Sequence, residues 1–185
     1  MAPIDYNKLS KSVCDELRSA FQNVIDANPK QTFYTFALWT DDSLQFANPC
    51  ANTEEGLEST VERYKREVDP EYDTVSTANG MRWSYGDWKF FPIDDDDYLS
   101  EVNEVLSENF NADEEVFEQQ IEPLWQALLD GFMQLDDDGL FGAGEERSKI
   151  TLLVVGDLPE EVVDHWAAAL NPKDVADRYI NWNYD

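Results

Sequence analysis

Carboxylates dominate the side chains of this sequence that could do chemistry. Of its 185 residues, 40 are Asp or Glu, whereas 13 are Lys or Arg. The two densest acidic runs consist of Asp94, Asp95, Asp96 and Asp97 and of Asp136, Asp137 and Asp138. Clustered like charges repel one another, so they destabilise a fold unless they are screened or face a cationic partner. We therefore predict that both runs belong to a partner-binding surface; the alternative is that each is a solvated loop without a partner.

The second acidic run also falls within a near match to a calcium-binding loop. Asp136, Asp138, Gly139 and Glu145 stand at the third, fifth, sixth and twelfth positions of that loop. Gln134 occupies the first position, where Asp is expected, and the residues after Glu145 lead into a predicted strand instead of a helix. Because so many acids make chance matches easy, we predict no metal site and keep divalent-cation binding as an alternative function.

Other catalytic constellations are missing from the sequence. His165 is the only histidine, and its neighbours Val162, Val163 and Trp166 place it off the apolar face of its predicted helix. The chain has no Gly-x-Ser-x-Gly nucleophile motif and neither phosphate-binding glycine fingerprint. Two carboxylates can hydrolyse a glycoside, but 40 acidic residues do not single out a pair. We predict no enzyme and no cofactor, with an enzyme using an unrecognised carboxylate site as the alternative.

One cation lies within an aromatic segment of the chain. Arg82 is accompanied by Trp83, Tyr85 and Trp88. Guanidinium groups pair with carboxylates and stack on aromatic rings. We predict that Arg82 is an internal residue that ties the Trp-rich segment to the acidic scaffold; an exposed aromatic anchor at an interface is the alternative.

The net charge of −27 limits the possible partners. Nucleic acids and anionic membranes are excluded, because their phosphates must be contacted by Lys or Arg. A basic protein is favoured as the partner, although adaptation to high salt would also explain the charge.

Cys14 and Cys50 form no C-x-x-C motif, and the sequence shows neither a signal-peptide core nor an apolar run of transmembrane length. We expect a cytoplasmic protein with reduced thiols.

Hydrophobic spacing in the first part of the chain predicts a helix, a hairpin and a second helix. Residues 5–27 are predicted to be helical, because apolar residues recur there at helical intervals: Leu9, Val13, Leu17, Phe21 and Val24. Residues 32–40 lack Gly, Pro and charge and predict a buried strand, which a turn at 41–43 joins to a hairpin partner at 44–48. Asn52 and Glu55 predict a capping box at the start of the second helix.

The remaining sequence predicts two more strands and several helices. Residues 81–84 are interpreted as a short strand, and residues 149–155 as an apolar strand at the centre of the sheet. A helix follows the first acidic run, and a longer one begins near Asp113, where Pro123 is expected to kink or divide it. Two further helices follow Pro159 and Pro172. Residues 1–185 are thus predicted to form a single acidic α+β domain with a mixed, mainly antiparallel sheet of about four to five strands flanked by helices.

Several segments together resemble a bacterial family, domain of unknown function 4303. The resembling pieces are residues 33–42, 51–56 and 81–84 with Trp88, then 139–142 and 170–172. The resemblance implies a bacterial cytoplasmic protein of a kind often encoded near toxin systems, where small acidic proteins act as immunity factors, and it carries no catalytic residues. Charge and resemblance lead to one hypothesis: a non-enzymatic acidic protein-binding module, namely an immunity protein that neutralises a basic toxin such as a nuclease.

Overall fold

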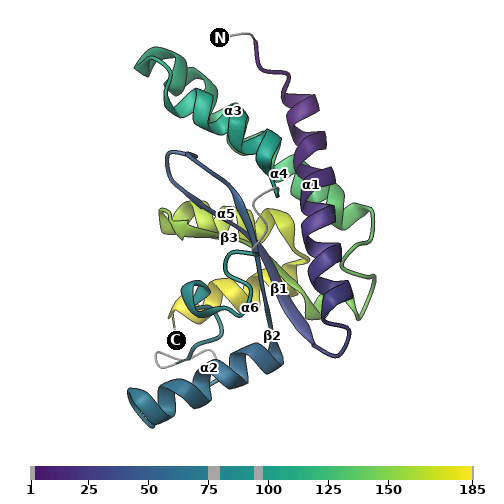
Figure 1. The fold of residues 1–185 in the computed structure, drawn as a ribbon, viewed down its shortest axis with the longest axis vertical. Helices are drawn as coiled ribbons and strands as arrows, with labels where there is room; N and C mark the ends of the chain where they lie inside the picture. Colours follow the sequence, from purple (N-terminus) through teal and green to yellow (C-terminus); the bar gives the residue numbers. More distant parts are fainter. Residues whose placement is uncertain (1–2, 75–79, 94–97, 185) are drawn as a thin grey trace.

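A mixed sheet runs through the centre of the molecule (Figure 1). The computed structural model describes residues 3–74, 80–93 and 98–184, and within these it contains three strands and six α-helices. The strands are β1 (Phe33–Asp41), β2 (Asn48–Thr53) and β3 (Thr151–Asp157). The helices are α1 (Tyr6–Ala27), α2 (Glu54–Glu67), α3 (Ser100–Phe110), α4 (Glu114–Asp137), α5 (Glu160–Leu170) and α6 (Lys173–Ile180). The predicted α+β class is confirmed.

The central strand of the sheet is β1. It pairs antiparallel with β2, where Ala37 lies opposite Cys50, and parallel with β3, where Ala37 lies opposite Leu153. The prediction of four to five mainly antiparallel strands is therefore wrong for the described residues. The predicted central position of β3 is also wrong, because β3 lies at an edge. Its apolar sequence reflects two covered faces, since Leu152 packs in one core cluster and Leu153 in another.

Two predicted strands do not form. Leu44 has a φ of 50°, so the chain is still turning where residues 44–48 were expected to be extended, and β2 begins at Asn48. Residues 81–84 instead lead into a 3₁₀ turn, η1 (Tyr85–Asp87). Phe90, just beyond this turn, exchanges two backbone hydrogen bonds with Ala51 of β2, at 3.0 and 3.3 Å. The aromatic segment thus covers the outer edge of β2 without becoming a strand.

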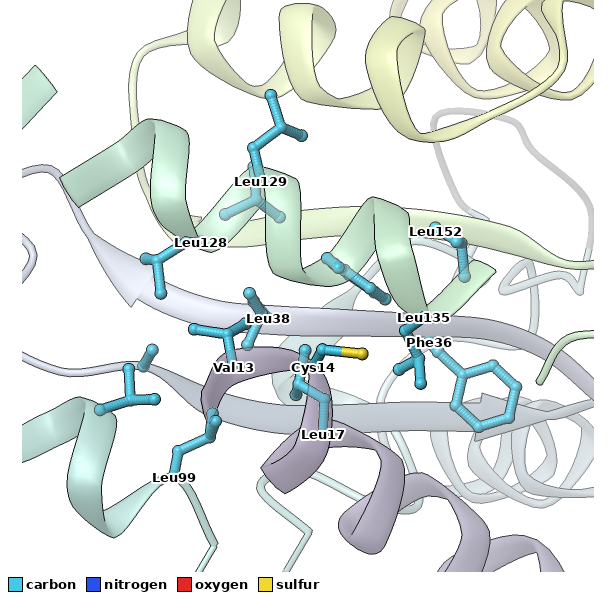
Figure 2. Close-up of a cluster of buried hydrophobic side chains, with 14 of the residues drawn as sticks. Val13, Cys14, Leu17, Phe36, Leu38, Leu99, Leu128, Leu129, Leu135 and Leu152 are labelled. Atoms are coloured by element: carbon cyan, nitrogen blue, oxygen red, sulfur yellow. The ribbon is translucent and has the colours of Figure 1, made fainter. Parts of the chain in front are cut away.

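One face of the sheet is covered by α1 and α4. The predicted first helix is confirmed: the Asp5 carboxylate accepts a 3.1 Å hydrogen bond from the Lys8 N–H, and the five apolar residues named above are buried. Figure 2 shows side chains of α1, β1 and α4 meeting in this core, among them Val13, Leu38 and Leu135. Burying such a continuous apolar layer is the main stabilising contribution to the fold.

Helix α4 continues through Pro123 and is not divided in two. A proline inside a helix removes one backbone hydrogen bond and costs about 3 kcal/mol. The apolar stripe nevertheless runs on without a break, because Ile121 packs before the proline and Leu124 and Leu128 pack after it, all in the same core cluster. Packing against α1 and the sheet offsets the loss.

The start of α2 differs by one residue from the prediction. Thr53 is the N-cap, and its Oγ1 accepts a 3.0 Å hydrogen bond from the Gly56 N–H. Asn52 instead donates from Nδ2 to the Tyr34 hydroxyl at 2.9 Å, deep in the interior. Glu55 does not close a capping box, because its carboxylate accepts from the N–H and the hydroxyl of Thr32, at 2.9 and 3.1 Å.

The opposite face of the sheet is covered by α6, by residues 80–93 and, beyond β2, by α2 (Figure 1). Aromatic side chains dominate this layer. Trp88 and Tyr179 pack over Ala37 and Leu153, while Tyr34 packs with Leu57 of α2. The small Ala37 on the strand leaves room for the large rings above it.

Candidate protein-binding surface

The structure describes three of the seven aspartates of the predicted partner surface. Outside the described residues are Asp94, Asp95, Asp96 and Asp97. Asp136 and Asp137 form the last turn of α4, and Asp138 is its C-cap. The Asp136 carboxylate accepts a 2.6 Å hydrogen bond from Arg147 Nε–H, and Asp138 forms an ion pair with Arg18 of α1. Of the second run, Asp137 alone is left without an ion pair to any described residue.

The partner of Asp136 is a buried arginine. Besides Asp136, the Arg147 guanidinium donates to the carbonyl of Ile150 at 2.6 Å and to that of Leu170 at 2.9 Å. Its 6% exposure means that its charge would be costly without a neighbouring carboxylate. Asp136 is therefore part of the internal structure that joins α4 to the C-terminal part of the chain. Sequence reasoning missed this pairing, because the run of acids gives no sign of which member faces inward.

The segment that resembles a calcium loop has the wrong backbone for one. Gln134, Asp136 and Asp137 lie in α4, whereas a calcium loop wraps irregular backbone around the ion. Among residues 3–74, 80–93 and 98–184, no three His, Cys, Asp or Glu side chains are grouped so that they could hold a metal.

A line of carboxylates follows the outer side of α4. We call Glu118, Glu122, Asp130 and Asp137 the acidic stripe. Their spacing places them along one side of the helix, and all four are exposed. In the part of the chain that the structure describes, no Lys or Arg forms an ion pair with them. Only Asp137 of this stripe was singled out by the sequence, because the others are isolated acids in a predicted helix.

A groove between α4 and α5 adjoins the acidic stripe. It encloses about 410 Å³ and is lined by Glu122, Trp125, Gln126, Leu129, Glu161, Val162, His165 and Trp166. The rings of Trp125 and Trp166 meet edge to face, with centroids 5.4 Å apart. Trp125 is only partly buried. One feature of the sequence could have indicated this site: Trp125 lies in a predicted helix near the polar residues Glu122 and Gln126.

The electrostatic environment of the α4/α5 groove is negative. Glu122 and Glu161 stand at its rim, and its lining contains no Lys or Arg. His165, predicted to be exposed, is exposed and lies beside them. Next to it on α5, burial and then the charge of Glu160 raise the pKa of the Asp164 carboxyl. The groove thus combines aromatic surface with carboxylates, which suits a cationic side chain on an apolar stem.

Arg82 has the internal role that its sequence context predicts. Its guanidinium donates two hydrogen bonds to the Glu54 carboxylate, at 3.0 and 2.7 Å, and stacks on the Tyr34 ring with 4.4 Å to the centroid. Its carbonyl accepts from the Tyr34 hydroxyl at 2.7 Å and from Trp88 Nε1 at 3.0 Å. This residue therefore fastens residues 80–93 to β1 and α2, as a bidentate arginine pair does well.

Fold and surface together define an α+β protein whose longest described helix, α4, carries a line of exposed acids and borders an aromatic groove. The family model described as "Domain of unknown function (DUF4303)" matches residues 14–172, and the chain belongs to this family. No curated protein and no solved structure matches the chain. Within the described residues, none of the helices has the length and apolar character needed to cross a membrane.

Proposed function

We propose that this protein is a non-enzymatic protein-binding module of the bacterial cytoplasm, and in its sharpest form an immunity protein that neutralises a toxin with a basic surface. The observation that carries the proposal is the acidic stripe, one member of which, Glu122, also lines the α4/α5 groove. Its four carboxylates have no cation of their own among the described residues, and the groove supplies an aromatic anchor point.

The two parts of this surface have different roles in binding. Exposed carboxylates accelerate encounter with a basic partner through long-range attraction, so they act mainly on the association rate. Trp125, backed by the buried Trp166, then receives a Lys or Arg side chain, whose stem packs on the Trp125 indole while its charge lies near Glu122 and Glu161. A toxin held in this way is neutralised when its basic active surface is covered.

The proposal is tested by capture and protection. Tagged protein is recovered from the native host at low salt, and the gene for any bound protein is expressed with and without this chain. We expect a stoichiometric basic protein that salt releases, that inhibits growth alone and that ceases to do so when this chain is present. Recovery of the chain alone under all growth conditions, or a bound protein whose toxicity is unchanged, would sink the proposal.

Matched variants then locate the surface. The triple variant Glu118→Gln, Glu122→Gln, Glu161→Gln removes one charge of the acidic stripe and the two carboxylates that line the groove. The control variant Glu58→Gln, Glu62→Gln, Glu71→Gln removes three exposed charges on or near α2. We expect the first variant to slow association and to flatten its salt dependence, and the second to do so much less. Trp125→Ala should instead speed dissociation. Equal effects of the two triple variants would mean that total charge, and not this surface, governs binding.

In the second acidic run, Asp137 is the residue that tests the proposed surface. Asp137→Asn changes an exposed carboxylate of the acidic stripe, whereas Asp136→Asn would remove the charge that balances the buried Arg147. We expect Asp137→Asn to slow association without changing the free energy of unfolding. An association rate equal to that of the wild type would remove Asp137 from the proposed surface.

A further inference from the structure

A second pocket opens on the other side of the molecule, where β1 and β3 begin. It encloses about 360 Å³, a size typical of sites for small ligands. Tyr34 of β1 and Thr151 of β3 lie at its base, and Arg82, Trp83, Lys149 and Arg178 complete most of its lining. Three cations are thus gathered around one pocket in a chain that has only 13 Lys and Arg against 40 acids.

The positive charge of this pocket is only partly neutralised. Glu54 pairs with Arg82, and Glu146 pairs with Lys149 at 2.7 Å near the rim. Arg178 donates a 2.7 Å hydrogen bond to the carbonyl of Ser148 and has no ion pair with any described residue. The other five arginines of the described residues each form an ion pair with a carboxylate, so the exposed Arg178 stands apart from them.

The inner wall of the pocket is rigid and polar. Arg82 uses two of its N–H donors on Glu54 and is held against the Tyr34 ring, so further donors of its guanidinium are fixed in place. Burial raises the pKa of the Tyr34 phenol, which therefore stays protonated. Trp83 packs edge to face on Tyr34 and Tyr179, with centroids 5.7 and 5.1 Å apart. This wall needs little reordering to receive a ligand.

Two polar atoms of the same layer have no hydrogen-bond partner among the described residues. They are the indole Nε1 of Trp83 and the hydroxyl of Thr35, both buried. Thr35 pairs in register with Thr151, so the two threonines are neighbours on one sheet face. Buried polar groups are normally satisfied. Trp83 lines the pocket, whereas Thr35 does not, so the indole N–H of Trp83 is the unpaired group that adjoins this site.

We propose that this pocket binds a small organic anion through a carboxylate or phosphate group, held by Arg178, Lys149 and the inner guanidinium of Arg82. The rest of the ligand packs against the rings of Tyr34 and Trp83. A polymeric anion does not fit this description, because it would extend from the pocket over a surface with a net charge of −27. The site is independent of the groove on α4 and α5, since the two share no lining residue.

The test is a titration of the intact protein, at low ionic strength, followed by the NMR signals of the tryptophan indole N–H groups. The Trp83 signal is assigned with Trp83→Phe. Inorganic phosphate and citrate are the two probes, so that the phosphate and carboxylate sources are distinguished. We expect one of them to shift the Trp83 signal in a saturable way at millimolar concentration. Absence of a saturable shift with both probes would overturn the proposal.

Two variants that remove equal charge distinguish binding of the anion in the pocket from its general attraction to positive charge. Lys149→Gln with Arg178→Gln removes two exposed cations of the pocket, and Lys65→Gln with Arg66→Gln removes an equal charge from the exposed end of α2. We expect about tenfold weaker binding for the pocket variant, as the loss of charge-assisted hydrogen bonds implies, and unchanged binding for the α2 variant. Equal weakening in both variants would show that the anion is attracted by charge alone.

Discussion

The two faces of the sheet are held by different kinds of contact. On the α1/α4 face, leucines, valines and phenylalanines form one continuous core that includes Phe36 and Phe132. On the α2/α6 face, aromatic rings are joined to hydrogen-bonded polar groups, such as Tyr34, Asn52 and Arg82. The first arrangement stabilises the fold by removing apolar surface area from water. The second stabilises it through hydrogen bonds, each of which contributes a modest net free energy. Stability is thus concentrated on one face, while the anion pocket is built into the other.

The largest loss of stability is expected from Phe132→Ala on the α1/α4 face. Phe132 is fully buried and its ring lies 6.0 Å from that of Phe21 and 6.2 Å from that of Phe141. We expect the free energy of unfolding to fall by about 3–5 kcal/mol, from lost transfer energy and the cavity left behind. Denaturant titration measures it. The adjacent Met133→Ala, at a residue that is 39% exposed, is the control and should change it by about 0.5 kcal/mol or less.

A smaller loss is expected from Arg82→Lys on the α2/α6 face. Lysine cannot reproduce the bidentate contact with Glu54 or the stacking on Tyr34. Because Glu54 is partly exposed, we expect a loss of about 1 kcal/mol in the free energy of unfolding. The exposed Arg66→Lys, whose pair with Glu67 lies at the surface, should cost close to nothing. If Arg82→Lys proved as costly as Phe132→Ala, the contrast between the two faces would not hold.

The smallest effect concerns a carboxylate on the apolar side. Burial, followed by the charge of Glu101, raises the pKa of Glu16, although backbone N–H groups at the start of α3 lower it in part. A raised folded-state pKa means that ionised Glu16 costs stability at neutral pH, and that this cost disappears as pH falls from the folded value to the unfolded one. Relative to Glu16→Gln, the wild type should therefore gain stability over that acidic range. A constant difference between the two proteins across the pH series would refute the role of Glu16.

Local sequence patterns predicted the helices well. The stripe from Leu9 to Val24 fixed both the extent and the buried side of α1, because helical periodicity and an Asp cap act within a few residues of one another. The strands were predicted less well. Leu44 adopts a positive φ, a conformation usually signalled by glycine, and no glycine stands at this turn. The sequence of β3 is typical of a central strand because both of its faces are covered, although only one of its edges is paired.

The candidate sites depend on contacts that local patterns do not contain. Trp125 and Trp166 meet from two helices, and Arg178 joins Lys149 and Arg82 from three separate segments. The pairing within the second acidic run could not be predicted for the same reason, since the cations that balance Asp136 and Asp138 come from a distant loop and from α1. Composition predicts that a partner should be cationic, but only the fold shows which carboxylates of the described residues form no ion pair.

The position of β1 between β2 and β3 has a consequence for synthesis on the ribosome. The parallel neighbour of Thr35 is Thr151, so β1 and β2 emerge long before β3. At typical translation rates, the apolar strand β1 waits roughly 5–20 s with one open edge. During this interval the nascent chain is vulnerable to pairing with other strands. The helices that are made in the same interval are rich in Asp and Glu, and repulsion between like charges disfavours such pairing.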